Sequence, residues 1–180
     1  GGAGFIGSHV ADTLIERGDA VIVLDNLDTG KIENIPNALA IDPKDVSKIT
    51  GGMIGFIEGS ILDTEILSHL VSSVDGIVHL AAIASVERCQ ENPSLDRAIN
   101  FDGLRNIMML SSSIESPCPV VFSSSAAVYG EPTKIPITED HSTTPISNYG
   151  VSKLDAERLI TEGDCIVPST AFRFFNVYGP

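Results

Sequence analysis

The sequence predicts an α/β fold built on a doubly wound parallel sheet. Helical and strand patterns take turns along the 180 residues, and the strand patterns are nearly continuous runs of Val, Ile and Leu. Such runs are typical of parallel strands, because helices cover both faces of a parallel sheet. The length and the 43% hydrophobic content suffice for one buried core, so we expect a single domain over residues 1–180.

The first half of the chain begins with a helical pattern. Apolar side chains at Ile6, Val10 and Leu14 have helical spacing, and Gly18 follows where the helix would end. The elements expected after this helix are a strand at 20–24, a strand at 54–57, a helix at 63–71 and a strand at 76–80.

The second half continues the alternation. A long helix is expected to begin at Pro93 and to reach Met108, and the prolines from Pro117 onward end the pattern. The elements expected next are a strand at 120–122, a helix at 148–161 and a strand at 169–175. The polar connection at 131–147 is long for a compact domain and is a candidate functional loop.

Composition excludes several classes of protein. A formal net charge of −13 argues against a protein that mainly grips nucleic acid, because phosphate binding needs surplus Lys and Arg. No apolar run approaches the roughly 20 residues that cross a bilayer, so we expect no membrane span. The odd number of widely spaced cysteines, Cys89, Cys118 and Cys165, suggests neither a disulfide framework nor a zinc site and fits a reducing cytoplasm.

Histidines give no metal signal. The four histidines lack metal-ligand spacing, so we assign no metal. His79 lies inside an apolar strand pattern and is expected to be a packed core residue.

A nucleotide-binding signal stands at the start of the chain. Gly1, Gly4 and Gly7 have the spacing GxxGxxG directly before the first helix, where backbone amides can approach a pyrophosphate. Asp25 ends the next strand, and its carboxylate can accept hydrogen bonds from an adenosine ribose. Because a carboxylate repels a 2′-phosphate and Lys31 is the nearest basic residue after it, the pattern favours NAD over NADP. A solvated turn aspartate is the alternative.

The ends of the chain suggest a fragment. The chain starts on glycine without Met and stops at Pro180 directly after an apolar run. The glycine loop should emerge from a strand at the centre of the sheet, so we expect truncation at that first strand. Apolar sheet surface should then be exposed.

A second cluster has the residues of an oxidoreductase site. Tyr149 and Lys153 share one face of a predicted helix, and an ammonium with a cationic nicotinamide would lower the pKa of the phenol and make it a base. The run Ser123-Ser124-Ser125 follows a strand at its carboxyl end, where doubly wound folds collect ligands. Ser125 could hydrogen-bond a reacting hydroxyl. Each signal alone also fits chance spacing or a turn, but together they favour a site.

A series of motifs resembles the extended short-chain dehydrogenase/reductase family, whose fold is Rossmann-type. The motifs are Gly1-Gly2-Ala3-Gly4-Phe5-Ile6-Gly7, Asp25-Asn26-Leu27, His79-Leu80-Ala81-Ala82, the stretch from Ser123 to Gly130, and Tyr149-Gly150-Val151-Ser152-Lys153. A last motif, from Arg173 to Pro180, is most similar to the UDP-glucose (UDP-galactose) 4-epimerases of that family. The resemblance spans the chain.

The resemblance implies the roles of the site residues. Tyr149 would be the acid/base, Lys153 its pKa-lowering partner and a ribose ligand, and Ser125 the hydroxyl that orients the sugar. Substrate contacts would come from Ser124, Ser125, Tyr149 and Asn176. NAD would be bound by Gly1, Gly4, Phe5, Ile6, Gly7, Asp25, Asn26, Leu27, Asp28, Thr29, Gly30, Ser60, Ile61, Leu80, Ala81, Ala82, Ala84, Asn100, Ser123, Tyr149, Lys153 and Phe175.

Four positions bear on affinity and reaction. Ser60 stands where the family usually has an adenine-contacting Asp, and Ala84 where some members have Lys. Dehydratases of the family usually carry Asp-Glu at the positions of Ala126 and Ala127, and alanine cannot exchange protons. Epimerisation through a transient 4-keto sugar is therefore favoured over dehydration or decarboxylation. A net dehydrogenase or reductase and a non-catalytic nucleotide-binding relative remain open alternatives.

The resemblance also implies what lies around this chain. Family members continue beyond the Asn176 motif into a smaller domain that binds the nucleotide sugar, and most of that domain is expected to be absent here. The implied partners are a UDP-hexose and a second copy of the chain, packed through helices near 96–110 and 149–161.

Overall fold

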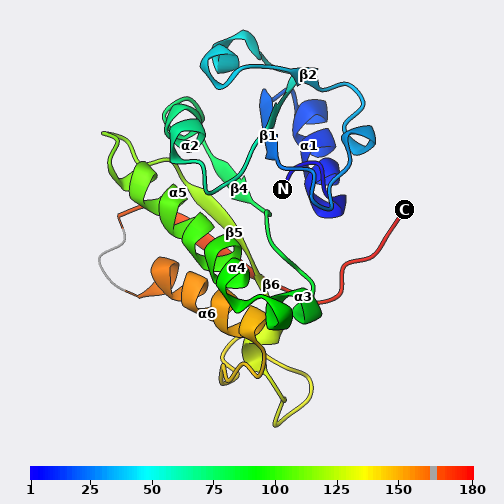
Figure 1. The fold of residues 1–180 in the computed structure, drawn as a ribbon, viewed down its shortest axis with the longest axis vertical. Helices are drawn as coiled ribbons and strands as arrows, with labels where there is room; N and C mark the ends of the chain where they lie inside the picture. Colours follow the sequence, from blue (N-terminus) through cyan, green and yellow to red (C-terminus); the bar gives the residue numbers. More distant parts are fainter. Residues whose placement is uncertain (163–165) are drawn as a thin grey trace.

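The protein is described by a computed structural model that covers residues 1–162 and 166–180. Helices and parallel strands alternate along the chain, as the sequence predicts (Figure 1). The main elements are α1 (Phe5–Arg17), β1 (Val21–Asp25), β2 (Leu39–Ala40), β3 (Ile54–Glu58), α2 (Thr64–Val71), β4 (Ile77–His79), α3 (Val86–Glu91), α4 (Pro93–Arg97), α5 (Gly103–Ser112), β5 (Val120–Ser125), α6 (Asn148–Thr161) and β6 (Ser169–Phe174). Short 3-10 helices lie at Ile32–Asn34, Pro43–Lys48 and Ala126–Tyr129, and a π-helical segment at Ala98–Asp102.

The strands pair in parallel, which confirms the α/β class. In the part of the chain that the structure describes they form two three-stranded sheets, in the orders β1-β3-β2 and β4-β5-β6. The single sheet expected from the sequence is therefore divided between β1 and β4. A cavity of about 980 Å³ lies there, lined by both strands. The strand expected before Gly1 would lie along these two edges, and it stays a prediction.

Two apolar clusters pack helices onto the strands that carry the site. One packs α5 and α6 onto β5, with Leu104 and Phe122 both 0% exposed. The other packs α1 onto β1 and β3 through Ala11, Val23 and Phe56. Figure 1 shows α1 beside β1, and α5 and α6 together beside β5.

One face of the second sheet carries exposed apolar side chains. Val78 on β4 is 44% exposed, Val121 on β5 36% and Phe172 on β6 49%. These residues alternate along their strands with buried neighbours such as Phe122, because successive side chains of a strand point to opposite faces. Exposed apolar sheet surface is what the sequence predicts for this chain.

The helical region between β4 and β5 differs most from the prediction. The helix expected from Pro93 to Met108 is α4, the π-helical segment and α5 in succession. The sequence did not predict α3, because Val86–Glu91 contains little apolar periodicity; Ser85 starts it by accepting a hydrogen bond from the Arg88 N–H at 3.2 Å. β5 extends past residue 122 to Ser125, because the serines continue the pairing with β6.

His79 and two of the cysteines are buried in the core. His79 is 3% exposed, stacks on Phe122 with ring centres 5.7 Å apart, and burial lowers its pKa to about 3, so it is an uncharged core residue as predicted. Cys89 and Cys118 are buried free thiols, and Cys165 lies outside the described residues.

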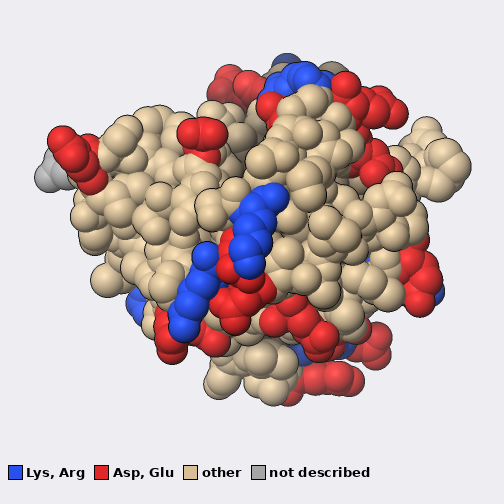
Figure 2. Space-filling model, turned by 90° about the horizontal axis from the view of Figure 1, so that it is seen from above, with Lys and Arg blue, Asp and Glu red and all other residues tan. Residues whose placement is uncertain are grey.

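Figure 2 shows acidic side chains spread around one face, with the basic ones beside them. None of the described helices is long and apolar enough to cross a membrane.

Candidate active site and nucleotide pocket

Asp25 joins the glycine turn to the end of β1. Its Oδ2 accepts a hydrogen bond from the Ala3 N–H at 3.0 Å and its Oδ1 one from the Leu27 N–H at 2.9 Å. The carboxylate is only 7% exposed, so the solvated-turn alternative is wrong. A Cβ on Gly30 would lie 2.9 Å from Oδ1, which is why a glycine passes this point. The turn and the carboxylate are thus held in one rigid unit.

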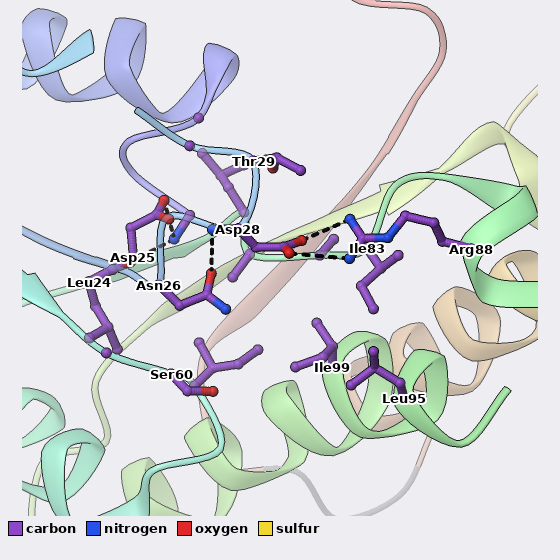
Figure 3. Close-up of a pocket in the computed structure, with 18 residues that line it drawn as sticks. Leu24, Asp25, Asn26, Asp28, Thr29, Ser60, Ile83, Arg88, Leu95 and Ile99 are labelled. Atoms are coloured by element: carbon purple, nitrogen blue, oxygen red, sulfur yellow. Dashed lines mark hydrogen bonds and ion pairs between the residues drawn. The ribbon is translucent and has the colours of Figure 1, made fainter. Parts of the chain in front are cut away.

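A cavity of about 180 Å³ opens between the loop after β1 and the segment after β4 (Figure 3). Many of the predicted cofactor residues line it: Gly1, Gly4, Asp25, Asn26, Asp28, Thr29, Gly30, Ser60, Ile61, Leu80, Ala81 and Ala82. Ile83, within the stretch 80–84 that the resemblance implies as cofactor wall, also lines it, and the sequence missed Leu24, Gly59, Arg88, Leu95 and Ile99. The last three come from helical segments whose approach to the pocket depends on long-range packing, so no local signal marks them.

The remaining predicted cofactor residues lie outside the lining of this cavity. They are Phe5, Ile6, Gly7, Leu27, Ala84, Asn100, Ser123, Tyr149, Lys153 and Phe175. A Cβ on Gly7 would lie 2.2 Å from the Gly1 carbonyl oxygen, so Gly7 lets α1 begin directly at the turn. Asn100 is 1% exposed and supports the pocket lining through Ile83. Its side chain accepts a hydrogen bond from the Ile83 N–H at 3.0 Å and donates one to the Ile83 carbonyl at 3.1 Å.

The predicted catalytic side chains come together where β5 ends and α6 begins. Ser147 caps α6 by accepting a hydrogen bond from the Gly150 N–H at 3.1 Å, which places Tyr149 in the first turn. Lys153 follows one turn later, with its Nζ 5.9 Å from the Tyr149 ring centre. Ser125 ends β5, and its Oγ accepts from the Ala127 N–H at 3.2 Å.

Burial controls the protonation of this pair. Lys153 is 1% exposed and its Nζ donates to the Ser123 carbonyl at 2.8 Å; burial lowers its pKa to about 7, against the opposing charge of Asp96. Burial also raises the pKa of Tyr149, and the hydrogen bond with Ser125 only partly offsets it. The prediction that Lys153 and a cationic nicotinamide together lower the pKa of Tyr149 stays a prediction, because desolvation of the phenolate is the largest effect when the protein's own groups act alone.

The side chain of Ser124 is buried, which corrects the prediction that it contacts the substrate. It is 3% exposed, and its Oγ donates to the Glu157 Oε2 at 2.7 Å. Glu157 in turn pairs with Arg173 on β6, so Ser124 belongs to a buried network between β5, β6 and α6. Side chains alternate along a strand, so Ser124 points away from the face that Ser123 and Ser125 share. Phe175 and Asn176 lie on exposed chain beyond β6, and their roles stay predictions.

A buried carboxylate that the sequence did not single out connects the two regions. Asp96 on α4 is 1% exposed; its Oδ1 accepts from the Asn100 Nδ2 at 2.6 Å and its Oδ2 from the Ser152 Oγ at 2.7 Å. Asn100 fixes Ile83 in the pocket wall, and Ser152 precedes Lys153 on α6. The only sequence signal was an acidic residue inside a helical pattern, which is usually a solvated face.

Comparison with known proteins adds to this geometry. Over residues 1–180 the chain matches the NAD dependent epimerase/dehydratase family. It is 37% identical over 182 residues to a putative UDP-glucose 4-epimerase of Methanocaldococcus jannaschii, covering 99% of this chain and 55% of that protein. It is also 37% identical over 188 residues to a UDP-N-acetyl-alpha-D-glucosaminuronate decarboxylase of Bacillus cytotoxicus, covering 100% of this chain and 54% of that protein.

A solved structure gives the same picture. The crystal structure of UDP-glucose 4-epimerase from Brucella ovis in complex with NAD superposes with a TM-score of 0.82 at 33% identity, covering 98% of this chain and 50% of that one. The chain spans about half the length of the relatives it matches.

Proposed function

The chain belongs to the NAD dependent epimerase/dehydratase family, and we propose that residues 1–180 form the NAD-binding and catalytic part of a UDP-glucose/UDP-galactose 4-epimerase. The observation that carries the proposal is the convergence of Ser125, Tyr149 and Lys153 at the end of β5, next to a pocket built on a glycine turn and Asp25. The likeness to 4-epimerases over almost the whole chain supports it.

The pocket residues fit NAD. The turn before α1 has no side chains that would bar a pyrophosphate, and Gly30 keeps the loop close enough for Asp25 to remain at the pocket wall. Asp25 is a carboxylate with both oxygens already aligned by backbone amides, as ribose recognition requires. When bound, NAD supplies oxidation and reduction at the sugar carbon.

The chain's own residues provide the proton chemistry. Tyr149 takes the proton from the sugar 4-hydroxyl and later returns it, with Ser125 hydrogen-bonded to the reacting oxygen. Lys153 is fixed at the Ser123 carbonyl, which holds its ammonium beside the phenol. No carboxylate stands at Ala126 or Ala127 to drive elimination of water, so oxidation at C4 is followed by reduction.

The relatives of this chain catalyse different reactions, which are the alternatives to epimerisation. A family decarboxylase is as similar in identity as the epimerase, so residues shared with both cannot alone choose the reaction. Ala126 and Ala127 favour epimerisation over dehydration and decarboxylation. A net dehydrogenase would reduce the cofactor stoichiometrically, and a non-catalytic relative would bind it without turnover.

The proposal includes a homodimer formed through α5 and α6. Met109 on α5 is 60% exposed and Val151 on α6 43%, so both helices present apolar side chains to solvent. Sedimentation of the full-length protein should show a dimer, and Met109→Glu should produce a monomer that keeps its fold. A wild-type monomer contradicts this part of the proposal.

The experiment uses the full-length protein with UDP-galactose and no added cofactor reductant. Formation of UDP-glucose without accumulation of NADH supports the proposal, and Tyr149→Phe should abolish the product. Stoichiometric NADH would identify a dehydrogenase instead. No product from any of several UDP-hexoses would exclude chemistry at sugar C4.

A further inference from the structure

The nucleotide pocket has an unusual charge balance for a pyrophosphate site. Among the described residues that line it, Arg88 is the one basic side chain, whereas Asp25 and Asp28 are both acidic. Asp25 accepts hydrogen bonds from the Ala3 N–H of the glycine turn and the Leu27 N–H of the loop after β1, and the proposed function assigns its carboxylate to the adenosine ribose. Arg88 and Asp28 are therefore the charged side chains left in this pocket to meet the pyrophosphate.

Arg88 and Asp28 form an ion pair at the mouth of the pocket. The guanidinium donates two hydrogen bonds to the carboxylate, from Nη1 to Oδ2 at 2.8 Å and from Nη2 to Oδ1 at 3.2 Å. Figure 3 shows the pair reaching from the loop after β1 to α3, with Ile83 beside the guanidinium. The two residues are 60 positions apart, so the pair connects the two halves of the fold.

The pair is well placed to exchange partners. The side chains are 43% and 46% exposed, and an ion pair in such contact with water contributes little net stability. In the part of the chain that the structure describes, the Asp28 carboxylate is held by Arg88 alone, and the Asp28 backbone N–H donates to the Asn26 side chain at 3.3 Å. A phosphate offers the same fork of two oxygens with more negative charge, and arginine binds it bidentately.

We propose that Arg88 is a ligand for the pyrophosphate of the dinucleotide and that Asp28 is its resting partner, which the pyrophosphate replaces. The inference rests on the proposed NAD-binding function. The glycine turn and the start of the 13-residue helix α1 offer backbone N–H groups from one side of the pocket, and Arg88 closes the other side with a full positive charge. Asp28 keeps the guanidinium at the mouth and competes with the ligand for it.

The test measures binding rather than turnover. In the full-length protein, freed of bound nucleotide, the affinities for ADP, NAD, adenosine and UDP are measured by calorimetry. Arg88→Gln should weaken ADP and NAD binding at least about tenfold and leave adenosine unchanged, because only the first two carry the pyrophosphate. Arg105→Gln is the matched control: Arg105, in the first turn of α5, also forms an exposed ion pair, with Asp102 three residues before it, and does not line the pocket.

Asp28→Asn should act in the opposite direction. Removing the competing carboxylate frees the guanidinium, so ADP should bind several-fold more tightly. In the Arg88→Gln background the same Asp28→Asn change should have much less effect, because its action passes through Arg88. A purely structural ion pair would instead make both single variants bind more weakly.

The outcomes separate this inference from the proposed function. If wild type binds ADP and NAD but Arg88→Gln matches Arg105→Gln, the assignment of Arg88 is overturned while the proposed function stands. If Arg88→Gln weakens UDP and spares ADP, Arg88 serves the substrate and the assignment is likewise overturned. If wild type binds neither ADP nor NAD, the proposed function itself fails.

Discussion

Asp96 offers the sharpest test of how this structure is held together. Its carboxylate is 1% exposed and accepts hydrogen bonds from Asn100 and Ser152 at 2.6 and 2.7 Å. Asp96→Asn keeps the shape but offers one acceptor oxygen to two donors, so one strong hydrogen bond to a charged group is lost. Such bonds contribute about 1.5–3 kcal/mol each, and we expect a loss of about 2 kcal/mol.

Asp96→Ala should cost more. It leaves the Asn100 amide and the Ser152 hydroxyl without their acceptor, and it removes the charge that favours the buried ammonium of Lys153. Removal of one partner from a buried charged network typically costs about 3–5 kcal/mol. Lys153 can limit this cost by releasing its proton, because its pKa is already lowered to about 7. We therefore expect about 3 kcal/mol, at the lower end of the range.

Urea unfolding of the full-length protein measures both losses as a lower midpoint with an unchanged slope. Asp12→Asn is the control, since Asp12 lies on the exposed face of α1. A double-mutant cycle with Ser152→Ala should show a coupling of about 1 kcal/mol or more. If Asp96→Asn loses no more stability than Asp12→Asn, or the cycle shows no coupling, the network does not carry the stability assigned to it here.

Three further predictions concern the pocket and the site. Gly30→Ala should weaken NAD binding at least about tenfold by calorimetry, because its Cβ would press on the fixed Asp25 carboxylate, whereas Gly76→Ala, with its nearest atom at 3.9 Å, should not. Burial lowers the pKa of Lys153 from 10.5 to about 7. Between these pH values the unfolded chain binds more protons than the folded chain, so stability rises with pH. The melting temperature of wild type should therefore rise relative to that of Lys153→Met as the pH increases from about 7 to 10. Ser125→Ala should lower kcat about 100-fold with little change in melting temperature. Ser124→Ala should lower the melting temperature with little change in kcat. Equal effects of the two substitutions would contradict the assignment of the two side chains to opposite faces of β5.

Local pattern was sufficient to predict most of the fold. Strands β1, β3 and β5 were predicted because each is a run of apolar residues, and α6 because its polar start and periodicity are both local. The same locality explains why the spacing of Tyr149 and Lys153 was informative: a helix brings residues four apart to one face whatever surrounds it. The error at Ser124 was avoidable, because continuing the two-residue period from buried Phe122 places Ser124 on the core side.

Contacts between distant residues were beyond the sequence. Asp96 meets Ser152 across 56 positions and Arg88 meets Asp28 across 60, and neither pair has a local signature. The π-helical segment that carries Asn100 also has no composition that separates it from an ordinary helix. These contacts position the helical part of the pocket wall, so the sequence predicted the glycine turn, Asp25 and the segment from Leu80 to Ala82 but not Arg88, Leu95 and Ile99.

Protonation depends on burial, which the sequence also does not show. The pKa of Lys153 falls and that of Tyr149 rises, and in both cases desolvation is the largest cause, so burial favours the neutral form of each residue. The sequence predicted that the Lys153 ammonium and a cationic nicotinamide act together on the phenol, and the protein's own groups do not lower its pKa. Under the proposed function, a positive charge brought beside Tyr149 must therefore provide the missing stabilisation of the phenolate. We expect the phenol of Tyr149 to titrate at a lower pH with NAD than with ADP, which fills the same pocket without a cationic ring, and equal titration would show that the protein alone sets this pKa.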